Sequence, residues 1–456
     1  MKLRPILITI VLIAGHVCVL AQQTNSSMQA TPAGPRALNL HEAIDLALKH
    51  NHVVRIASMH VEEQQHAKDV ARSAYLPNLR NDTSFAHVTD TQLIEIAAGS
   101  LGTTGTTPIP PRDHLLNQGG KDIFVSGTGL TQPLTELFKI KAANDAARAE
   151  VEASRGKAQD VENQVELKVR QLYYRILVTQ SQHRAIEAKI RAVEDLQGER
   201  VQQVKYGSTL EADLIETRAQ SLQAKQELLT TDLQLSDLRM QFNDVLGLPI
   251  RTDVALDPNI PTPPTSCERE ECVKLALDSQ PEITEARAMV QKAEAGVRAA
   301  KREYIPDVEA FARYSHQNNN VPFLAPNFGT FGVHASYDIF DGGKKRATLK
   351  ERDAQLAQAK ENLVRISDDV ELRVQTAWNK LERTQQMVAV SQELLAARTE
   401  ARRVSAQQLE RGAYLRSQAE AATAQEFEAQ TLFLQSQLDY AQAHDELSQA
   451  IGVMAH

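Results

Sequence analysis

The chain has 456 residues and a net charge of −8, and it contains 5% aromatic residues, one Trp and three Cys. The acidic balance excludes nucleic acid as a main partner, because phosphate binding needs a surplus of basic residues, and so few cysteines exclude a zinc-bound or disulfide-rich scaffold. Ala, Gln, Glu, Leu and Arg dominate instead, which favours long helices over several aromatic-rich globular domains.

The first residues are typical of a secretory signal peptide, predicted to cover residues 1–21. Lys2 and Arg4 precede an apolar run from Ile6 to Leu20, and Ala21 provides a small residue for cleavage. A membrane anchor is the alternative, but the run falls short of a span of about 20 residues. No other apolar run has the length of a transmembrane helix, so a mature chain in a membrane is expected to span it as β-strands.

Residues 22–248 begin with a predicted helix over residues 40–75. Asn39 is a suitable N-cap, and Pro77 ends the helix because proline disfavours helical backbone before it. Two strands are predicted next, over residues 79–88 and 122–132. Between them, residues 98–120 are rich in Gly, Thr and Pro, which predicts a loop rather than a regular element.

A very long helix is predicted from Pro133 to Lys205, where Gly156 and Gly198 are the only glycines. It is expected to reverse at Tyr206-Gly207-Ser208, because glycine suits the positive φ that ends a helix. A second helix then returns to Leu246-Gly247.

Residues 249–268 form a predicted linker. Five prolines fall in this stretch, so an extended conformation is expected. Cys267 and Cys272 remain after signal-peptide cleavage and could pair in an oxidising compartment. Both two free thiols and a local disulfide are compatible with the sequence.

Residues 269–456 repeat the order of elements. A helix is predicted over residues 270–304, with Ser266 as its N-cap and Pro306 as its stop signal. Strands are predicted over residues 307–316 and 330–340. A second long helix is expected to reverse at Arg411-Gly412-Ala413 and to return to Ile451-Gly452.

Aromatic residues concentrate in the second pair of strands. Eight of the chain's 21 aromatic residues lie within residues 304–340, and apolar residues occupy the odd positions of residues 331–339. Apolar and polar residues that alternate, together with clustered aromatic residues, are typical of a transmembrane β-hairpin with an aromatic girdle at the membrane interface. They fit the alternative, an edge strand of a soluble β-sandwich, less well. The predicted girdle residues are Phe311, Tyr314, Phe331 and Tyr337.

The two halves are an internal duplication. Tyr75 and Pro77 recur 229 residues later as Tyr304 and Pro306. Beyond the strands the offset becomes 205, as when Gly207 recurs as Gly412. Two constant offsets indicate a duplicated architecture, and the difference between them is accounted for by the extra Gly-rich segment of the first half.

Four predicted strands cannot close a barrel, and an open sheet in lipid would leave unpaired edges. Several chains must therefore share one barrel, and three chains supply twelve strands, enough for a lumen. The predicted fold class is mainly α with a β-barrel part. Each protomer is expected to contribute four strands and long coiled-coil hairpins to a helical tube beneath the barrel, packed through narrow seams.

The sequence contains no catalytic or metal-binding pattern. Gly-rich residues 99–105 do not lie between a strand and a helix, and neither a Gly-x-Ser-x-Gly elbow nor a His-Glu-x-x-His motif occurs. The histidines of the first helix are not spaced i, i+4, so a metal site is not expected. The chain is predicted not to be an enzyme and to need no cofactor.

With these features in place, the chain resembles the TolC-like outer-membrane efflux protein family over nearly the whole mature sequence. The resemblance implies a homotrimer with a twelve-stranded barrel in outer-membrane lipid and a twelve-helix tunnel in the periplasm. It implies a passive exit duct of a tripartite efflux or type I secretion system, working with a periplasmic adaptor protein and an inner-membrane pump. A structural or adaptor-type periplasmic coiled-coil protein is the alternative, but it leaves the duplication and the alternating aromatic strands unexplained.

The resemblance also implies that the two helix tips dock the adaptor. The corresponding residues are Tyr206, Gly207 and Ser208 at the first tip and Arg411, Gly412 and Ala413 at the second.

Members of this family often carry acidic constriction residues near these tips. Asp213 matches such a position, Glu216 adds a second carboxylate, and the second tip has Gln418 instead. We hypothesise that Asp213 pairs with Arg411 or Arg416 of the neighbouring tip and helps to keep the periplasmic mouth shut. The alternative is a solvated surface pair, worth about 0–1 kcal/mol.

Overall fold

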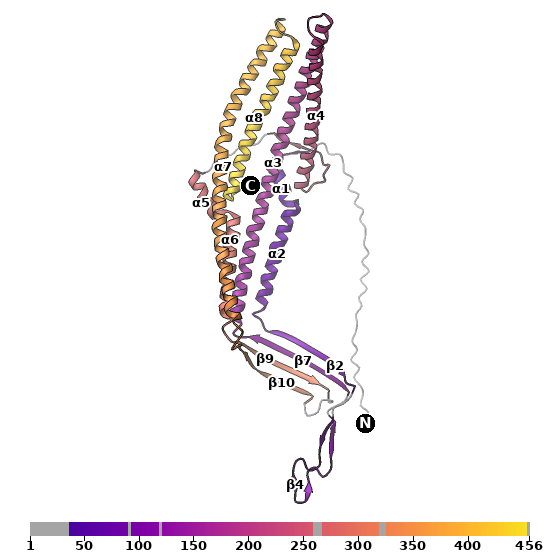
Figure 1. Ribbon diagram of the computed structural model, residues 1–456, viewed down its shortest axis with the longest axis vertical. Helices are drawn as coiled ribbons and strands as arrows, with labels where there is room; N and C mark the ends of the chain where they lie inside the picture. The colour runs from indigo at the N-terminus through magenta and orange to yellow at the C-terminus, as the bar shows by residue number, and fades with distance from the viewer. Residues whose placement is uncertain (1–35, 90–92, 118–120, 259–266, 319–324, 454–456) are drawn as a thin grey trace.

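The computed structural model describes residues 36–89, 93–117, 121–258, 267–318 and 325–453. The predicted signal peptide and Ser266 lie outside these residues. The described chain is elongated, with the tips of the long helices at one end and the strands at the other (Figure 1).

Two long helical hairpins confirm the predicted repeat. The long helices lack internal proline, and the first, at 69 residues, spans about 100 Å. Their bounds are α3 Leu137–Lys205 and α4 Glu211–Val245 in the first half, and α7 Lys344–Glu410 and α8 Arg416–Ile451 in the second. Within the described residues, no helix combines the length and the apolarity that crossing a membrane requires.

The helix that opens each half is broken once, where the sequence predicted one continuous helix. The pieces are α1 Leu40–His50, α2 His52–Ser73, α5 Arg269–Ser279 and α6 Pro281–Arg302. Asn51 is extended, and its side chain accepts from Val53 N and donates to Val245 O, 194 residues away. Gln280 is extended because it precedes Pro281, which disfavours helical backbone there. The predicted cap is confirmed, since Asn39 Oδ1 accepts from Glu42 N at 2.8 Å.

A four-stranded antiparallel sheet lies at the end opposite the helix tips. Its strand order is β10-β9-β7-β2, so the two hairpins of the two halves meet through β7 and β9. The strands are β2 Asn78–His87, β7 Asp122–Pro133, β9 Asp307–Gln317 and β10 Asn327–Ser336.

The last strand begins three residues earlier and ends four residues earlier than predicted. It ends at Ser336, so residues 337–340 are not part of it. Ser336 is opposite Asp307, the first residue of β9, and the residue before Asp307 is Pro306, which has no N–H to extend the ladder. Beyond the strand, Asp341 accepts from the N–H groups of Gly343 and Lys345, which forms a turn into α7.

The Gly-rich segment of the first half is more ordered than the predicted loop. It continues the β2–β7 hairpin as a narrow ribbon beyond the sheet (Figure 1). In it, β3 Leu93–Ile96 pairs with β6 His114–Asn117, and β4 Thr103–Thr104 pairs with β5 Thr107–Pro108. Gly105 adopts φ +67° between β4 and β5, so the glycines here serve a tight turn.

Part of the proline-rich linker is anchored to the helices. β8 Val254–Leu256 pairs in parallel with β1 Arg36–Leu38. The buried Tyr173 hydroxyl of α3 donates to Leu38 O at 3.0 Å and to Asp257 O at 2.8 Å. Burial raises the pKa of Tyr173 to about 12, so it remains a donor at neutral pH.

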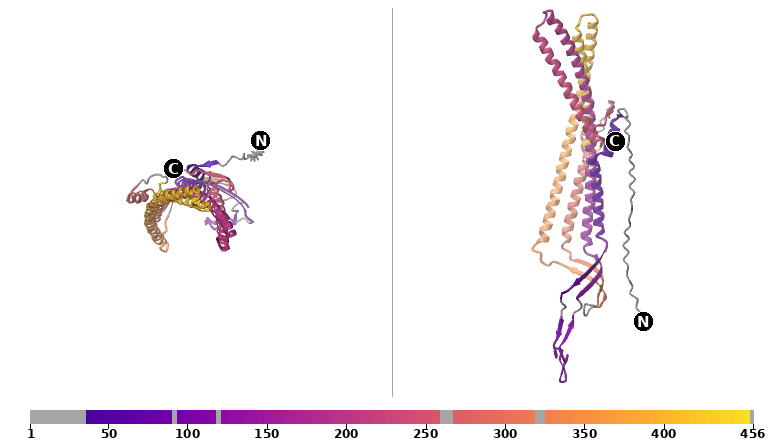
Figure 2. Two further views of the ribbon diagram at one scale, coloured as in Figure 1. Left: turned by 90° about the horizontal axis from the view of Figure 1, so that it is seen from above. Right: turned by 90° about the vertical axis from the view of Figure 1, so that its right-hand side faces the viewer.

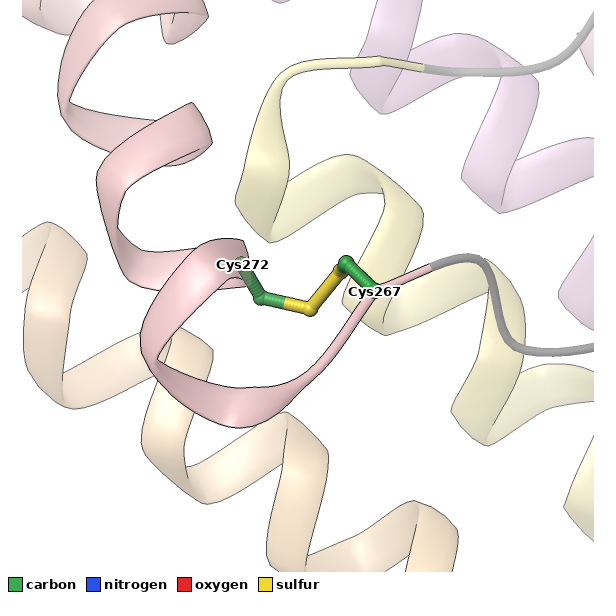
Figure 3. The surroundings of a disulfide bond; sticks show 2 residues. All are labelled: Cys267 and Cys272. Carbon is green, nitrogen blue, oxygen red and sulfur yellow. A yellow bond between two sulfur atoms is a disulfide. The ribbon is translucent and has the colours of Figure 1, made fainter.

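Cys267 and Cys272 form a disulfide at the start of α5 (Figure 3). The sequence had left this pairing open. Their Cα atoms are 5.6 Å apart, and Cys272 is fully buried against α7 and α8 among residues that include Val374 and Ile451. The disulfide therefore fixes the end of the linker to the core of the second half.

The helices form a single curved layer (Figure 2). Near the strands, neighbouring helices follow the order α2-α3-α6-α7, and toward the tips the order is α4-α3-α8-α7. We call this curved layer the helical wall. One of its edges is formed by α7 along its whole length, and the other is formed by α2 near the strands and by α4 toward the tips. The two larger apolar cores lie where α1 and α5 cover the wall, and a smaller one, of Ala188, Ala192 and Ala424, lies between α3 and α8.

Candidate functional site

The two helix tips lie side by side at one end of the molecule, as the sequence predicted (Figure 1). Gly207 has φ +68° and Gly412 has φ +72°. Ser208 N donates to Gln203 O and Ala413 N to Gln408 O, both at 2.9 Å, which closes the end of each long helix. A Cβ at either glycine would meet nothing within 4 Å, so both tips are open to a partner.

Three of the predicted gate residues are engaged locally. Asp213 Oδ2 accepts from Thr209 Oγ1 at 2.7 Å, in the first turn of α4. Glu216 Oε1 accepts from Gln220 Nε2 at 3.3 Å. Gln418 Oε1 accepts from Leu415 N at 3.0 Å, so this amide caps α8.

Arg416 joins the two tips, but not through the residue expected. Its Nε lies 3.0 Å from Asp195 Oδ2 on α3. Beside this ion pair, Glu199 accepts from the N–H of Ser417 at 2.8 Å and from its hydroxyl. In the described part of the chain, no ion pair joins Asp213 to Arg411 or Arg416, so the hypothesised pairing does not form within one chain. Asp195 and Glu199 are one helical turn apart on α3, and both contact α8. These contacts depend on how the two hairpins are aligned, so the sequence alone does not predict them.

Further from the tips, α3 and α8 are joined by a buried polar cluster that sequence reasoning missed. Arg170 bonds Glu166 at 2.6 Å and Asp445 at 3.1 Å, and Tyr174 donates to Asp445 at 2.7 Å. Burial raises the pKa of Asp445, opposed by the neighbouring Arg170. Because a buried ion pair is costly to break, the cluster fixes the two halves in one register.

Both edges of the helical wall carry exposed apolar side chains. On α4 these include Ile215, Leu222 and Leu229, spaced seven apart, and on α7 they include Val390 and Val404. Ile215 and Val404 are each eight residues from their tip glycine, and Leu229 and Val390 are each 22 residues away. The apolar positions of the two edges thus lie at matching heights. Apolar stripes of this length are rarely left in water.

The strand register assigns the residues of the sheet to two faces. Phe331 is opposite Ala312, and Tyr314 lies two residues further on the same face, which also carries Val333 and Leu130. Phe331 is 89% exposed. The other face carries the charged residues Arg80, Asp82, Glu309 and Arg313. One face of the sheet is therefore apolar near the helices, and the other is charged.

Phe311 differs from the expectation for a girdle residue. It is opposite Gly332, and a Cβ on that glycine would lie 3.3 Å from its ring. It therefore shares the face of Arg313 rather than that of Tyr314, because successive residues of β9 point to opposite faces. Phe331 is opposite Ala312, which places it on the face of Tyr314. Tyr337 lies just beyond β10, with Lys345 Nζ 4.6 Å from its ring centroid.

The described residues offer no group of three or more His, Cys, Asp or Glu side chains able to hold a metal ion. The geometry is instead that of a curved wall with open tips and complementary edges.

Comparisons with known proteins agree with this geometry. The family described as "Outer membrane efflux protein" matches residues 43–248 and 272–453. The solved Campylobacter jejuni CmeC outer membrane channel is similar in fold, with a TM-score of 0.74 at 14% identity over 91% of this chain and 85% of that one. The Vibrio cholerae outer membrane protein VceC gives a TM-score of 0.71 at 15% identity, covering 91% and 96%. The open state of the Neisseria gonorrhoeae MtrE channel gives 0.70 at 16% identity, covering 91% and 89%. Among curated proteins, no sequence matches.

Proposed function

The chain belongs to the outer membrane efflux protein family, and from this premise we propose that three copies form the exit duct of a tripartite efflux or type I secretion system. The duct conducts substrates passively, from an inner-membrane pump and a periplasmic adaptor to the outside. The strands lie in the outer membrane and the helices extend into the periplasm.

The observation that carries the proposal is the complementarity of the two edges of one chain. The exposed strand edges are β10 on the α7 side and β2 on the side of α2 and α4. Alternating antiparallel pairs make β10 and β2 run in opposite directions, so β10 of one copy can pair with β2 of the next. The apolar stripe of α4 then faces the stripe of α7 at the same heights. Such an interface is head-to-tail, and it generates a ring when the rotation closes.

Three copies satisfy the closure of the sheet. Four strands per chain give twelve in a closed ring, which removes every strand edge and leaves a lumen. The apolar face with Phe331 and Tyr314 then contacts lipid, and the charged face lines water. On this basis the predicted girdle role is proposed for Tyr314 and Tyr337, whereas Phe331, at the middle of β10, is proposed to face the hydrocarbon of the bilayer.

A cross-linking experiment tests the ring. In the variant Leu229→Cys/Val390→Cys, we expect disulfide-linked dimers and trimers on non-reducing gels, because the two positions face each other between copies. Leu229→Cys and Val390→Cys alone are the controls and should stay monomeric under the same conditions. Cross-links absent from the double variant, in membranes where the protein is assembled, would contradict the proposed edge pairing.

The tips are proposed to dock the adaptor through Tyr206, Gly207, Ser208, Arg411, Gly412 and Ala413. Near them, the Arg416–Asp195 pair and the Ser417–Glu199 bonds are proposed to restrain the mouth of the duct, with Asp213, Glu216 and Gln418 lining it. The support is their position: among the described residues, these contacts are the polar links between the two hairpins that lie nearest to the tips.

The gate is tested by Arg416→Ala. Removing an exposed ion pair weakens the closed arrangement by up to about 1 kcal/mol, so the mean single-channel conductance in planar bilayers should rise by up to about fivefold. Arg411→Ala removes the same charge five residues earlier, at the end of α7, where no ion pair forms among the described residues, and it should leave conductance near that of the wild type. Equal effects of the two variants would exclude a specific role for the Arg416 pair.

A further inference from the structure

The junction between the last strand and the second long helix exposes apolar side chains next to basic ones. Beyond β10, Ile339 is 93% exposed and Phe340 is 89% exposed, while Tyr337 is half-exposed. α7 then begins with Lys344-Lys345-Arg346. We call Tyr337, Ile339, Phe340, Lys344, Lys345 and Arg346 the junction collar.

The first half carries the same arrangement at its own strand-to-helix junction. Leu134 is exposed after β7, and Lys139 and Lys141 follow at the start of α3. Leu134, Lys139 and Lys141 are each 205 residues before Ile339, Lys344 and Arg346, which is the offset of the duplication. A cation also lies over an exposed ring at each junction: Lys345 Nζ is 4.6 Å from the Tyr337 centroid, and Arg302 Cζ of the second half is 4.9 Å from that of Phe138 in the first half. The duplication therefore places apolar and basic groups together twice in each chain.

Basic residues outnumber acidic ones in the segment that carries the basic part of the collar. Residues 341–350 contain four basic residues and one acidic residue, Asp341. Each carboxylate oxygen of Asp341 accepts a hydrogen bond from a backbone N–H group at 2.9 Å. The nearby Asp307 forms an ion pair with Lys139, with 2.6 Å between Nζ and Oδ1. Among the described residues, neither Lys344 nor Arg346 forms an ion pair. Four acidic residues line a pocket together with Lys344 and Lys345, whereas Arg346 does not line it; they are Glu303, Asp307, Asp338 and Asp341.

We propose that the junction collar binds anionic phospholipids of the leaflet that faces the periplasm, with acyl chains against Ile339 and Phe340 and headgroup phosphate on Lys344 and Arg346. This inference rests on the proposed function, which sets the strands in the outer membrane. The collar continues the apolar face of β10, which carries Phe331, Val333 and Ala335, so it lies where that face meets water. Aromatic and aliphatic side chains at such a boundary are commonly followed by Lys or Arg that reach the phosphates. Clustered basic residues beside a membrane attract anionic headgroups.

Quenching of Phe340→Trp by brominated phospholipids tests the headgroup preference. The native Trp378 lies 34 residues from Lys344 along α7, about 50 Å from the membrane, so it adds a constant background. The protein is reconstituted in equal mixtures of phosphatidylglycerol and phosphatidylethanolamine. In one preparation the phosphatidylglycerol is brominated, and in the other the phosphatidylethanolamine is brominated. Phe340→Trp is compared with the same substitution combined with Lys344→Gln/Arg346→Gln. The matched control combines it with Lys350→Gln/Lys360→Gln, two exposed lysines further along α7.

We expect the brominated anionic lipid to quench about threefold more effectively than the brominated zwitterionic lipid. This preference should disappear in Lys344→Gln/Arg346→Gln and persist in Lys350→Gln/Lys360→Gln. Equal quenching by the two lipids, or a preference that survives Lys344→Gln/Arg346→Gln, would overturn the headgroup assignment while leaving the duct intact. Quenching by neither lipid would place Phe340 outside the membrane and would contradict the proposed orientation of the strands as well.

Discussion

Gly412→Trp is expected to reduce export by about tenfold or more while trimers still assemble. Gly412 adopts φ +72°, and a Cβ there meets nothing within 4 Å. The local cost is therefore that of an L-residue in the left-handed region, about 1–2 kcal/mol, which the packing of α7 on α8 can bear. The indole, however, projects from the tip into the space proposed for the adaptor, and blocking the centre of an interface commonly costs more than tenfold in affinity.

The measurement is the resistance, or the export of a substrate, that the variant restores to a strain lacking its own copy of the gene. Trimer assembly is followed in the same cells by heat-modifiable migration on gels. Gly412→Asn is the matched control, because Asn tolerates positive φ and is small, and it should restore export close to the wild-type level. Wild-type export by Gly412→Trp would show that the adaptor does not use this tip.

Phe331→Arg should nearly abolish assembled trimer in the outer membrane. Phe331 lies on the apolar face of the sheet, and an Arg facing lipid near the middle of the bilayer costs about 2–4 kcal/mol in each chain. Three such charges in one ring multiply the effect, so we expect at least about tenfold less heat-stable trimer in membrane fractions.

His334→Arg is the matched control for this prediction. It adds the same side chain three residues away, on the charged face of β10, where its partner in the register is Glu309. Opposite charges directly across a strand pair are favourable, so trimer levels should stay near the wild type. Equal losses in both variants would contradict the assignment of the two faces, as would normal assembly of Phe331→Arg.

Much of the fold is predictable because local signals mark it. Pro77 and Pro306 end helices, Gly207 and Gly412 supply the positive φ of the tips, and the constant offsets reveal the duplication before any element is drawn. These features act within a few residues of the backbone they control, so one sequence is enough to find them.

Other features depend on contacts between distant segments and were not predicted. The helix break at Asn51 is fixed by a bond to Val245, 194 residues away. The ribbon forms because β3 pairs with β6 and β4 with β5, although the Gly-rich and Pro-rich composition of the segment is typical of a loop.

At the candidate site, the tip glycines were located correctly, but the polar partners were not. Arg416 pairs with Asp195 because the register between α3 and α8 is set wherever the two helices pack together, including the buried cluster of Arg170, Glu166 and Asp445. Phe311 was expected in the girdle because aromatic residues cluster there, yet the alternation within β9 turns it to the charged face. Residue type suggested the chemistry, and only the register decided which side chains meet.

Single-channel recording of the purified wild-type protein in planar bilayers tests the central claim most directly, because a duct must carry ions across a lipid barrier. We expect discrete current steps of uniform size, each from one inserted trimer. Insertion of trimers without any current step would contradict a duct through the outer membrane.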